Sequence, residues 1–320
     1  MTVDSQTLRD RILATVSETG VPGLMRRSTR LALGWLSGRL AAGERALFYL
    51  EATKRLSAEQ RRAGLEAARH LRDRHQRKPA FVIGTGPSVA AAPLATLAPY
   101  ATFGVNSLFM HPAFASWSPT YYCLMDDHFF NDDAAAKDFA TRLTSRLDSR
   151  TEFIVPAKHL EAVRRSGFPG GTVSFIPMDG SLHDRGSLEI KPEELVPCAP
   201  NSVLFALTMA LLTGASPIYL LGAEHSWLTE RPGVDPAKPH FHAERLAITQ
   251  PNSVKAAWNP FDTYLRTIRY CESIWESYEV LAAYAAARGI EIYNATPNSF
   301  LDVFPSTTLE AALARVSSAR

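Results

Sequence analysis

Hydrophobic and polar positions follow different patterns on the two sides of residue 79 in this 320-residue chain. Residues 1–78 contain no strand-like run, and their apolar residues recur at helical spacing. Within them, Ser57-Ala-Glu-Gln60 has the sequence of a capping box and predicts a helix that continues to about His75. We therefore expect residues 1–78 to form a helical N-terminal extension.

From residue 79 onward, short apolar runs alternate with helical patterns. The runs predict strands near 80–84, 101–105, 120–125, 151–155, 172–176, 217–222 and 290–293. The patterns between them predict helices near 88–98, 107–115, 133–147, 157–166, 201–214 and 270–288. This alternation is typical of an α/β fold with a doubly wound, mostly parallel, Rossmann-like sheet, which we expect over residues 79–320.

The first strand ends in a glycine turn, Gly84-Thr85-Gly86-Pro87-Ser88. Glycine permits backbone angles that a side chain forbids, and Ser88 can cap the start of a helix. Such a turn points N–H groups outward and favours an anion such as a phosphate. It is neither a P-loop nor a GxGxxG motif, because the Lys-Ser/Thr pair and the third glycine are both missing. A purely structural turn is the alternative.

Polar residues follow the next two predicted strands, at the sheet edge where doubly wound proteins bind ligands. Asn106 can donate and accept hydrogen bonds to a phosphate or a sugar hydroxyl, or it can simply cap a helix. Asp126 and Asp127 can hold a sugar hydroxyl, ligate Mg²⁺ or cap the following helix. Because adjacent strand residues point to opposite faces, a shared metal requires a turn at this position. We expect no metal unless these two carboxylates hold it.

Two further turns carry small polar residues at the same predicted edge. Asn201 and Ser202 open the apolar helix that Gly214 ends, and they form a second candidate phosphate or nucleobase site. Asn298 and Ser299 follow the last predicted strand. These residues, together with the glycine turn, are expected to surround a single crevice.

A long stretch without a clear element, about residues 223–265, is predicted to be a lid insertion. It contains three histidines, His225, His240 and His242. An imidazole over the strand ends is suited to act as a general base on a hydroxyl. The alternatives are metal binding by the His-Phe-His sequence, which lacks a spaced third ligand, and histidines that are only solvated or hydrogen-bonded.

Composition and charge narrow the class of protein. The chain is 46% hydrophobic and 21% charged, no apolar run reaches the roughly 18 residues that span a bilayer, and no secretory signal is present. Three scattered cysteines indicate a reducing compartment, so we expect a cytoplasmic protein.

Residues 1–80 hold 16 Lys and Arg against 8 Asp and Glu. Their basic helices can pack on the main domain or a second subunit, or contact an anionic membrane from its inner face. No nucleic-acid recognition motif is present.

Four segments occur in an order that resembles a known group of families. They are Ile83-Gly-Thr-Gly-Pro-Ser88, Phe103-Gly-Val-Asn106, Ile218-Tyr-Leu-Leu-Gly222 and Ile292-Tyr-Asn-Ala-Thr-Pro-Asn-Ser299. This arrangement resembles the bacterial lipooligosaccharide sialyltransferases, the motility accessory factor proteins that glycosylate flagellin, and the archaeal 6-hydroxymethylpterin diphosphokinase-like proteins. The likeness covers about residues 79–305.

The resemblance implies an inverting glycosyltransferase of cell-envelope or flagellar saccharides. Its donor would be a nucleotide-sugar, with a CMP-sugar favoured, its acceptor a saccharide or glycoprotein, and no cofactor would be bound permanently. It implies donor contacts from Gly84, Gly86, Ser88 and Asn106, and nucleotide contacts from Asn201, Ser202, Asn298 and Ser299. The family histidine is expected at Trp258–Thr263, which contains none, so His240 or His242 would replace it.

Two alternatives to glycosyl transfer remain. One is an Mg²⁺-dependent diphosphokinase of the pterin type, with Asp126 and Asp127 as the metal ligands. The other is a non-catalytic nucleotide- or sugar-binding module.

Overall fold

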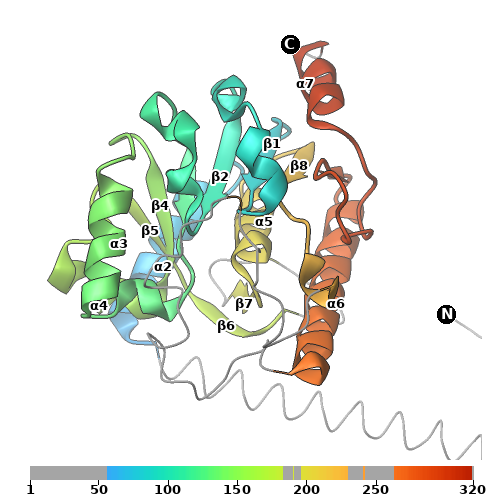
Figure 1. Ribbon diagram of the computed structural model, residues 1–320. Helices are drawn as coiled ribbons and strands as arrows, with labels where there is room; N and C mark the ends of the chain where they lie inside the picture. The colour runs from blue at the N-terminus through green and yellow to red at the C-terminus, as the bar shows by residue number, and fades with distance from the viewer. Residues whose placement is uncertain (1–55, 183–189, 191–195, 230–240, 242–262, 319–320) are drawn as a thin grey trace, which may run out of the picture. The chain divides into compact units, whose positions relative to one another are not determined.

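The computed structural model describes residues 56–182, 190, 196–229, 241 and 263–318 (Figure 1). The chain divides into two compact units, Met1–Ala52 and Thr53–Arg320, and all the described residues belong to the second. The α-helices of the described residues are α2 (Ala58–Leu71), α3 (Ala134–Thr144), α4 (Leu160–Ser166), α5 (Ser202–Leu212), α6 (Tyr264–Ala286) and α7 (Leu309–Ser318). The strands of the described residues are β1 (Ala80–Ile83), β2 (Ala101–Val105), β3 (Tyr121–Cys123), β4 (Glu152–Pro156), β5 (Val173–Ile176), β6 (Met178–Ser181), β7 (Val196–Cys198), β8 (Ile218–Leu221) and β9 (Ile292–Asn294).

Seven of these strands form one parallel sheet in the order β5-β4-β3-β2-β1-β8-β9. From β1 the chain adds strands outward to β5, and it then returns to the other side of β1 with β8 and β9. Each of the seven strands lies where an apolar run predicted one. The predicted class is confirmed: the protein has an α/β, Rossmann-like fold with a parallel sheet and flanking helices.

Helices cover both faces of the sheet because the strands are apolar on both sides. In β1, Ala80 and Val82 pack into one core with α2, α5 and α6. Phe81 and Ile83 pack into a second core with α3, α4, α7 and the short helices. Helix α5 has nearly all of its residues buried, as expected for an element that is apolar all round.

Two predicted α-helices are instead pairs of short 3₁₀ helices. The segment expected as 88–98 forms η1 (Pro87–Ala91) and η2 (Leu94–Leu97), with Pro93 between them. The segment expected as 107–115 forms η3 (Leu108–Met110) and η4 (Pro112–Ala115). Proline fits only the first turn of a helix, so Pro93 and Pro112 each end one helix and start another.

Several other boundaries differ from those predicted. Helix α6 begins six residues earlier than expected, because the Thr263 side chain accepts a hydrogen bond from the Arg266 N–H and caps it there. The predicted helix at 157–166 starts as the 3₁₀ helix η6 (Ala157–His159) and continues as α4. The loop expected at 179–200 contains β6 and β7, which pair in parallel with each other. Helix α7 was not predicted.

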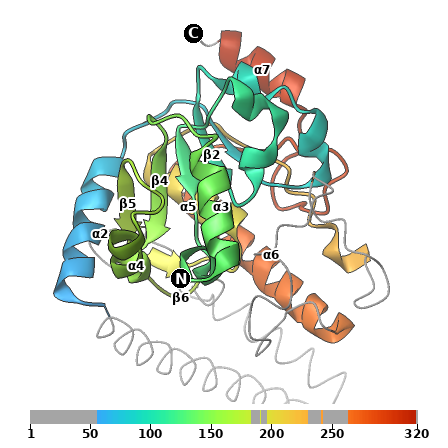
Figure 2. The same ribbon diagram turned by 60° about the vertical axis from the view of Figure 1, so that its left-hand side comes forward.

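Helix α2 begins at the predicted capping box: Ser57 Oγ accepts from the Gln60 N–H at 3.1 Å, and Gln60 Oε1 accepts from the Ser57 N–H at 2.7 Å. It packs beside β5, as Figure 2 shows, and contributes Ala67 and Leu71 to the core. Residues 1–55, which include most of the expected extension, lie outside the described residues.

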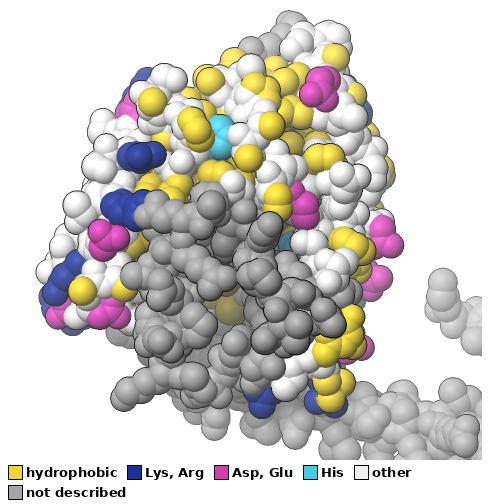
Figure 3. Space-filling model, viewed as in Figure 1, with side chains coloured by type: hydrophobic (Ala, Val, Ile, Leu, Met, Phe, Trp, Pro, Cys, Tyr) yellow, Lys and Arg dark blue, Asp and Glu magenta, His cyan; other side chains and the backbone are white. Residues whose placement is uncertain are grey.

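The surface of α6 has one apolar region. Tyr264, Leu265 and Ile268, in its first turns, are 48%, 57% and 44% exposed. Figure 3 shows hydrophobic side chains at the lower right, where α6 lies in the same view of Figure 1. Among the described residues, no helix combines the length and the apolar character needed to cross a membrane.

Candidate functional site

The topology places a crevice at the carboxyl end of β1. The chain leaves β1 towards β2 on one side and returns through β8 on the other, so the loops after β1 and β8 diverge. Ligands of open α/β sheets bind at such a switch point. A cavity of about 110 Å³ lies there, lined by residues that include Thr85, Gly86, Asn106, Asn201, Ser202, Glu224 and His225.

Six of the predicted site residues therefore meet at one place. Thr85, Gly86, Asn106, Asn201, Ser202 and His225 come from four separate stretches of the sequence and line the same cavity. Of the other predicted residues, Ser88 and Asp126 bond to residues of its lining. The remaining ones, taken up below, lie farther out or outside the described residues.

Gly84 and Gly86 allow the ends of β1 and β8 to approach closely. A Cβ atom on Gly84 would overlap the Gly222 carbonyl oxygen, and one on Gly86 would overlap the Glu224 carboxylate. Gly86 has a φ of −66°, which any residue can adopt. The glycine pair is thus required here by space, whereas the sequence suggested unusual backbone angles.

The N–H groups of the glycine turn are largely used inside the protein. The Gly84 and Gly86 N–H groups donate to the backbone carbonyls of Leu221 and Gly222, at 2.8 and 3.0 Å. The Ser88 N–H donates to Glu224 Oε1 at 2.6 Å. The Glu224 carboxylate thus occupies the position at this turn where the sequence predicted a phosphate.

Glu224 is the main residue of the site that the sequence analysis missed. It follows β8 by three positions, and its second oxygen, Oε2, is buried and has no hydrogen-bond partner. Its position in the sequence could have indicated a role in the site, because an acidic residue stands just after a predicted strand at a predicted switch point. Its contact with the glycine turn joins residues 136 positions apart, which no local pattern reveals.

Two non-glycine residues of the lining hold a left-handed backbone. Asn106 and His225 have φ values of 49° and 52°. The Tyr122 hydroxyl fixes the Asn106 backbone by donating to its carbonyl oxygen at 2.7 Å, while Asn106 Oδ1 is buried without a hydrogen bond. Strained conformations in non-glycine residues concentrate at functional sites.

His225 is buried and hydrogen-bonded, with its Nε2 2.8 Å from the Tyr278 hydroxyl oxygen. Burial lowers its pKa to about 3, so the ring is neutral at neutral pH and is a weak base. Its geometry suits a structural link between the end of β8 and α6.

His240 and His242, the other predicted bases, lie outside the described residues. Phe241, between them in the sequence, is described: its N–H donates to the Thr85 carbonyl oxygen at 2.9 Å. Its ring lies 5.7 Å from that of His111, centre to centre. Phe241 is thus attached to the glycine turn.

The start of α5 supplies hydrogen-bond donors to the cavity. Asn201 caps the helix by accepting from the Leu204 N–H at 2.8 Å, and the Ser202 hydroxyl donates to Asp126 Oδ2 at 3.4 Å. The first N–H groups of a helix lack partners within it, and the helix dipole adds positive potential at this end. Burial is the main cause that raises the pKa of the Asp126 carboxyl.

Asp127 has other partners than Asp126. It pairs with Lys158 and with His159, the latter at 3.2 Å, and the hydrogen bond to His159 is the main cause that holds its pKa well below the usual range. The two carboxylates therefore have separate partners, as expected for adjacent residues at the end of a strand. Within the described ranges, no group of three or more His, Cys, Asp and Glu side chains is placed to hold a metal.

The turn at Asn298 and Ser299 lies beside the cavity, but neither residue is among those that line it. Ser299 Oγ donates to the Ala223 carbonyl oxygen at 2.6 Å, and the Phe300 N–H donates to the Glu224 carbonyl oxygen at 2.9 Å. Asn298 is exposed, with a φ of 53°. The turn fixes the backbone that carries Glu224.

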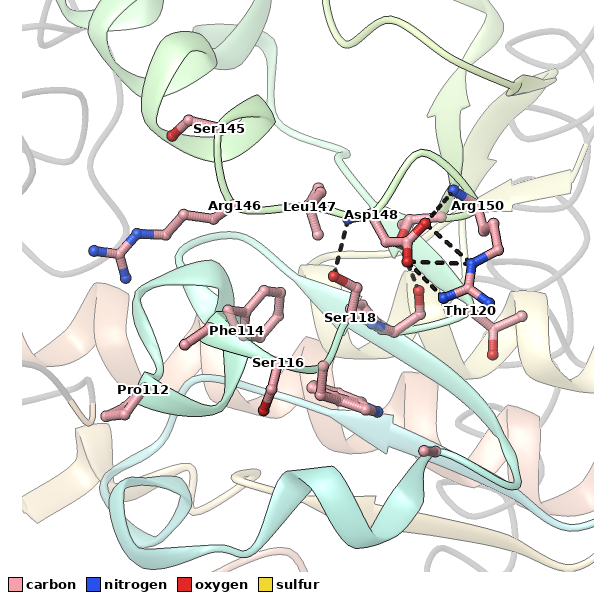
Figure 4. Close-up of a pocket in the computed structure, with 15 residues that line it drawn as sticks. Pro112, Phe114, Ser116, Ser118, Thr120, Ser145, Arg146, Leu147, Asp148 and Arg150 are labelled. Carbon is pink, nitrogen blue, oxygen red and sulfur yellow. Dashed lines mark hydrogen bonds and ion pairs between the residues drawn. The ribbon is translucent and has the colours of Figure 1, made fainter.

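A larger cavity, of about 950 Å³, lies at the opposite, amino-terminal ends of β3 and β4 (Figure 4). Its lining includes Phe114, Trp117 and Arg146, and on its rim Arg150 pairs with Asp148 at 2.6 Å. It contains none of the predicted site residues and lies at the edge of the sheet that doubly wound folds do not use for ligands. We therefore assign the candidate site to the smaller cavity.

No family model matches the chain, and a search of curated proteins found no match.

Proposed function

We propose that the protein is a glycosyltransferase that binds a nucleotide-activated sugar at the carboxyl end of β1. The supporting observation is that the glycine turn, Asn106 and the Asn201-Ser202 pair share one cavity at the switch point of a Rossmann-like sheet. The glycine turn and Asn106 belong to the segments whose order resembles the sialyltransferases and flagellin glycosyltransferases. That resemblance favours a CMP-sugar donor and a saccharide or glycoprotein acceptor.

In this proposal the donor phosphate binds at the start of α5. Asn201 caps the Leu204 N–H, and the Ser202 and Val203 N–H groups with the dipole of this 11-residue helix favour an anion there. The glycine turn is less suitable, because its Gly84, Gly86 and Ser88 N–H groups already donate to Leu221, Gly222 and Glu224. We therefore place the donor phosphate at the start of α5 and not at the glycine turn.

The proposed reaction is a direct displacement with inversion. A base removes the proton from an acceptor hydroxyl, whose oxygen bonds to the anomeric carbon while the bond to the phosphate oxygen breaks. The nucleotide leaves with the bonding electron pair, and the α5 N–H groups stabilise its growing negative charge. We assign the base to His240 or His242, since Phe241 between them is bonded to Thr85. His225 is a poor candidate, because its pKa is about 3.

The diphosphokinase alternative lacks a specific supporting observation. It would place one Mg²⁺ between Asp126 and Asp127, whereas Asp126 bonds to Ser202 and Asp127 pairs with Lys158 and His159.

Ligand-induced thermal stabilisation tests the proposal. We expect CMP to raise the unfolding temperature of the full chain without added metal, because a ligand at 100 times its Kd stabilises by about 2.7 kcal/mol. UDP, GDP and ATP, each with and without Mg²⁺, are the comparisons. Stabilisation by ATP only with Mg²⁺ would support the diphosphokinase instead, and a folded sample that responds to no nucleotide would contradict both enzymes.

The base is tested separately with His240→Ala and His242→Ala. We expect one of them to abolish transfer from a CMP-sugar while CMP binding stays unchanged. His70→Ala, on the exposed face of α2, is the matched control. Full turnover in both lid variants would remove these histidines from the mechanism.

A further inference from the structure

We propose that Glu224 and Asn106 recognise a vicinal diol on the sugar ring attached to the ligand phosphate, and thereby determine ligand specificity. The inference rests on the proposed function, since it assumes that a nucleotide or nucleotide-sugar occupies the cavity. The diol can belong to the ribose of the nucleotide or to the transferred sugar.

The two oxygens of Glu224 have different surroundings. Oε1 is held 2.6 Å from the Ser88 nitrogen, and the missing side chain of Gly86 leaves room for the carboxylate. Oε2 is buried and accepts no hydrogen bond. No Lys or Arg of the described residues forms an ion pair with Glu224. One oxygen thus fixes the side chain, and the other is available to a donor.

Asn106 presents a second acceptor of the same kind. Its Oδ1 is buried without a partner, and its backbone is held in a left-handed conformation at the end of β2. A buried acceptor without a donor costs about 1–3 kcal/mol. Two of them in one cavity indicate a ligand that supplies two donors.

Another part of the cavity lining selects among the possible donors. It is the start of α5, where Ser202 and Val203 are the first helical residues and present N–H groups and a positive potential. A metal ion or an ammonium group would be repelled by this helix end. A hydroxyl both donates and accepts, so it can satisfy the carboxylate and amide oxygens on one side and N–H groups on the other.

The size of the cavity agrees with a single sugar ring. Its volume of about 110 Å³ corresponds to roughly four water molecules, at ~30 Å³ each. A ring that carries two adjacent hydroxyls fills such a space, whereas a whole nucleotide does not. The ring bonded to the phosphate is the part of the ligand that lies next to the α5 phosphate site.

Isothermal titration calorimetry on the full chain tests the inference with CMP, 2′-deoxy-CMP and CMP-deaminoneuraminic acid, whose transferred sugar carries adjacent ring hydroxyls at C4 and C5. If the diol is that of ribose, wild type should bind CMP about tenfold more tightly than 2′-deoxy-CMP, and Glu224→Gln should remove most of this preference. If it is that of the transferred sugar, Glu224→Gln should weaken only CMP-deaminoneuraminic acid, again by about tenfold. Both results support the inference, and they distinguish the two sources.

Asn106→Gly is the second variant, because glycine keeps the left-handed backbone while it removes the amide oxygen. Asn106→Gly should weaken the binding of the same ligand as Glu224→Gln does. It tests the inference by itself if Glu224→Gln fails to fold. Glu279→Gln, an exposed position on α6, is the matched control and should change nothing.

Unchanged affinities in both variants, with CMP or CMP-sugar bound by wild type, would overturn the inference and leave the proposed function intact. Absence of binding of either ligand to folded wild type would overturn both.

Discussion

Single residues at the ends of β1 and β8 are constrained by atoms from distant parts of the chain. Gly84 is needed because the Gly222 carbonyl oxygen occupies the space of a Cβ atom, and Gly86 because Glu224 does. Asn106 and His225 hold strained backbones beside them. The sequence shows the two glycines, but it does not show which atoms occupy the space beside them. Strain and unsatisfied acceptors in one small volume are the features that single out this cavity.

His225 should make the protein sensitive to acid. Its pKa is about 3 when folded, against 6.5 for an unperturbed histidine. Below about pH 6.5 the unfolded chain gains a proton here that the folded protein does not bind. Stability is thus lost progressively as pH falls from about 6.5 towards 3. With ~1.36 kcal/mol for each pKa unit, the loss from this residue between pH 7 and pH 4 is about 3 kcal/mol.

Urea unfolding at pH 7, 5.5 and 4 measures this effect. His225→Asn is the comparison variant, because asparagine tolerates the left-handed φ and does not titrate. It should lose less stability than wild type between pH 7 and pH 4. An identical pH dependence in the two proteins would show that His225 protonates freely in the folded state.

At the scale of elements, local signals define the helix starts. Ser57, Asp133, Asn201 and Thr263 each accept a hydrogen bond from the first turn of their helix. These are short-range interactions, which explains why the start of α2 could be predicted. The ends are less regular: α2 stops at Leu71, before a turn in which Asp73 and Arg77 have positive φ values, although the sequence suggested continuation to His75.

Ser57→Ala should destabilise the protein by about 1 kcal/mol, because it removes the acceptor for the Gln60 N–H at the start of α2. The effect should appear in global unfolding, since α2 packs on β5 and contributes to the core. Urea denaturation measures it. Ser57→Asp keeps an acceptor at this position and should stay close to wild type. Equal losses in the two variants would show that the cap itself contributes little.

At the scale of the whole molecule, α5 is the central element. It lies in the core formed with the sheet, α2 and α6, and its first turn also forms a wall of the candidate site. The same helix therefore contributes apolar packing and the proposed phosphate site. A rigid central helix keeps its N-terminus fixed relative to the ends of β1, β2 and β8.

Leu207→Ala should be among the more damaging substitutions. This side chain is fully buried, and leucine-to-alanine changes in cores cost about 2–5 kcal/mol. Leu265→Ala, at a position that is 57% exposed on α6, should change stability by less than about 0.5 kcal/mol. Urea midpoints of the two variants measure the difference. Comparable losses would mean that Leu265 is covered in solution.

Glycosyl transfer, the diol contact and the lid histidines remain proposals. The seven strands and the fold class are confirmed. The signals behind those two predictions are contained in short stretches: apolar runs of strand length and the helical patterns between them. Segments with proline, such as 88–98, were assigned the wrong kind of helix, because the pattern of apolar residues alone does not distinguish a 3₁₀ helix from an α-helix.

The sequence by itself determined the seven strands of the main sheet, the α/β class and the polar residues that would stand at the strand ends, since all of these depend on neighbours along the chain. Only the tertiary structure decided which of them share a cavity. The Glu224 carboxylate accepts a hydrogen bond from Ser88 of the glycine turn, 136 positions away in the sequence. Asp126 and Asp127 are adjacent in the sequence but contact different partners. The physical reason is that these contacts depend on the order of strands in the sheet and on the direction of each side chain, and neither is encoded in a local pattern.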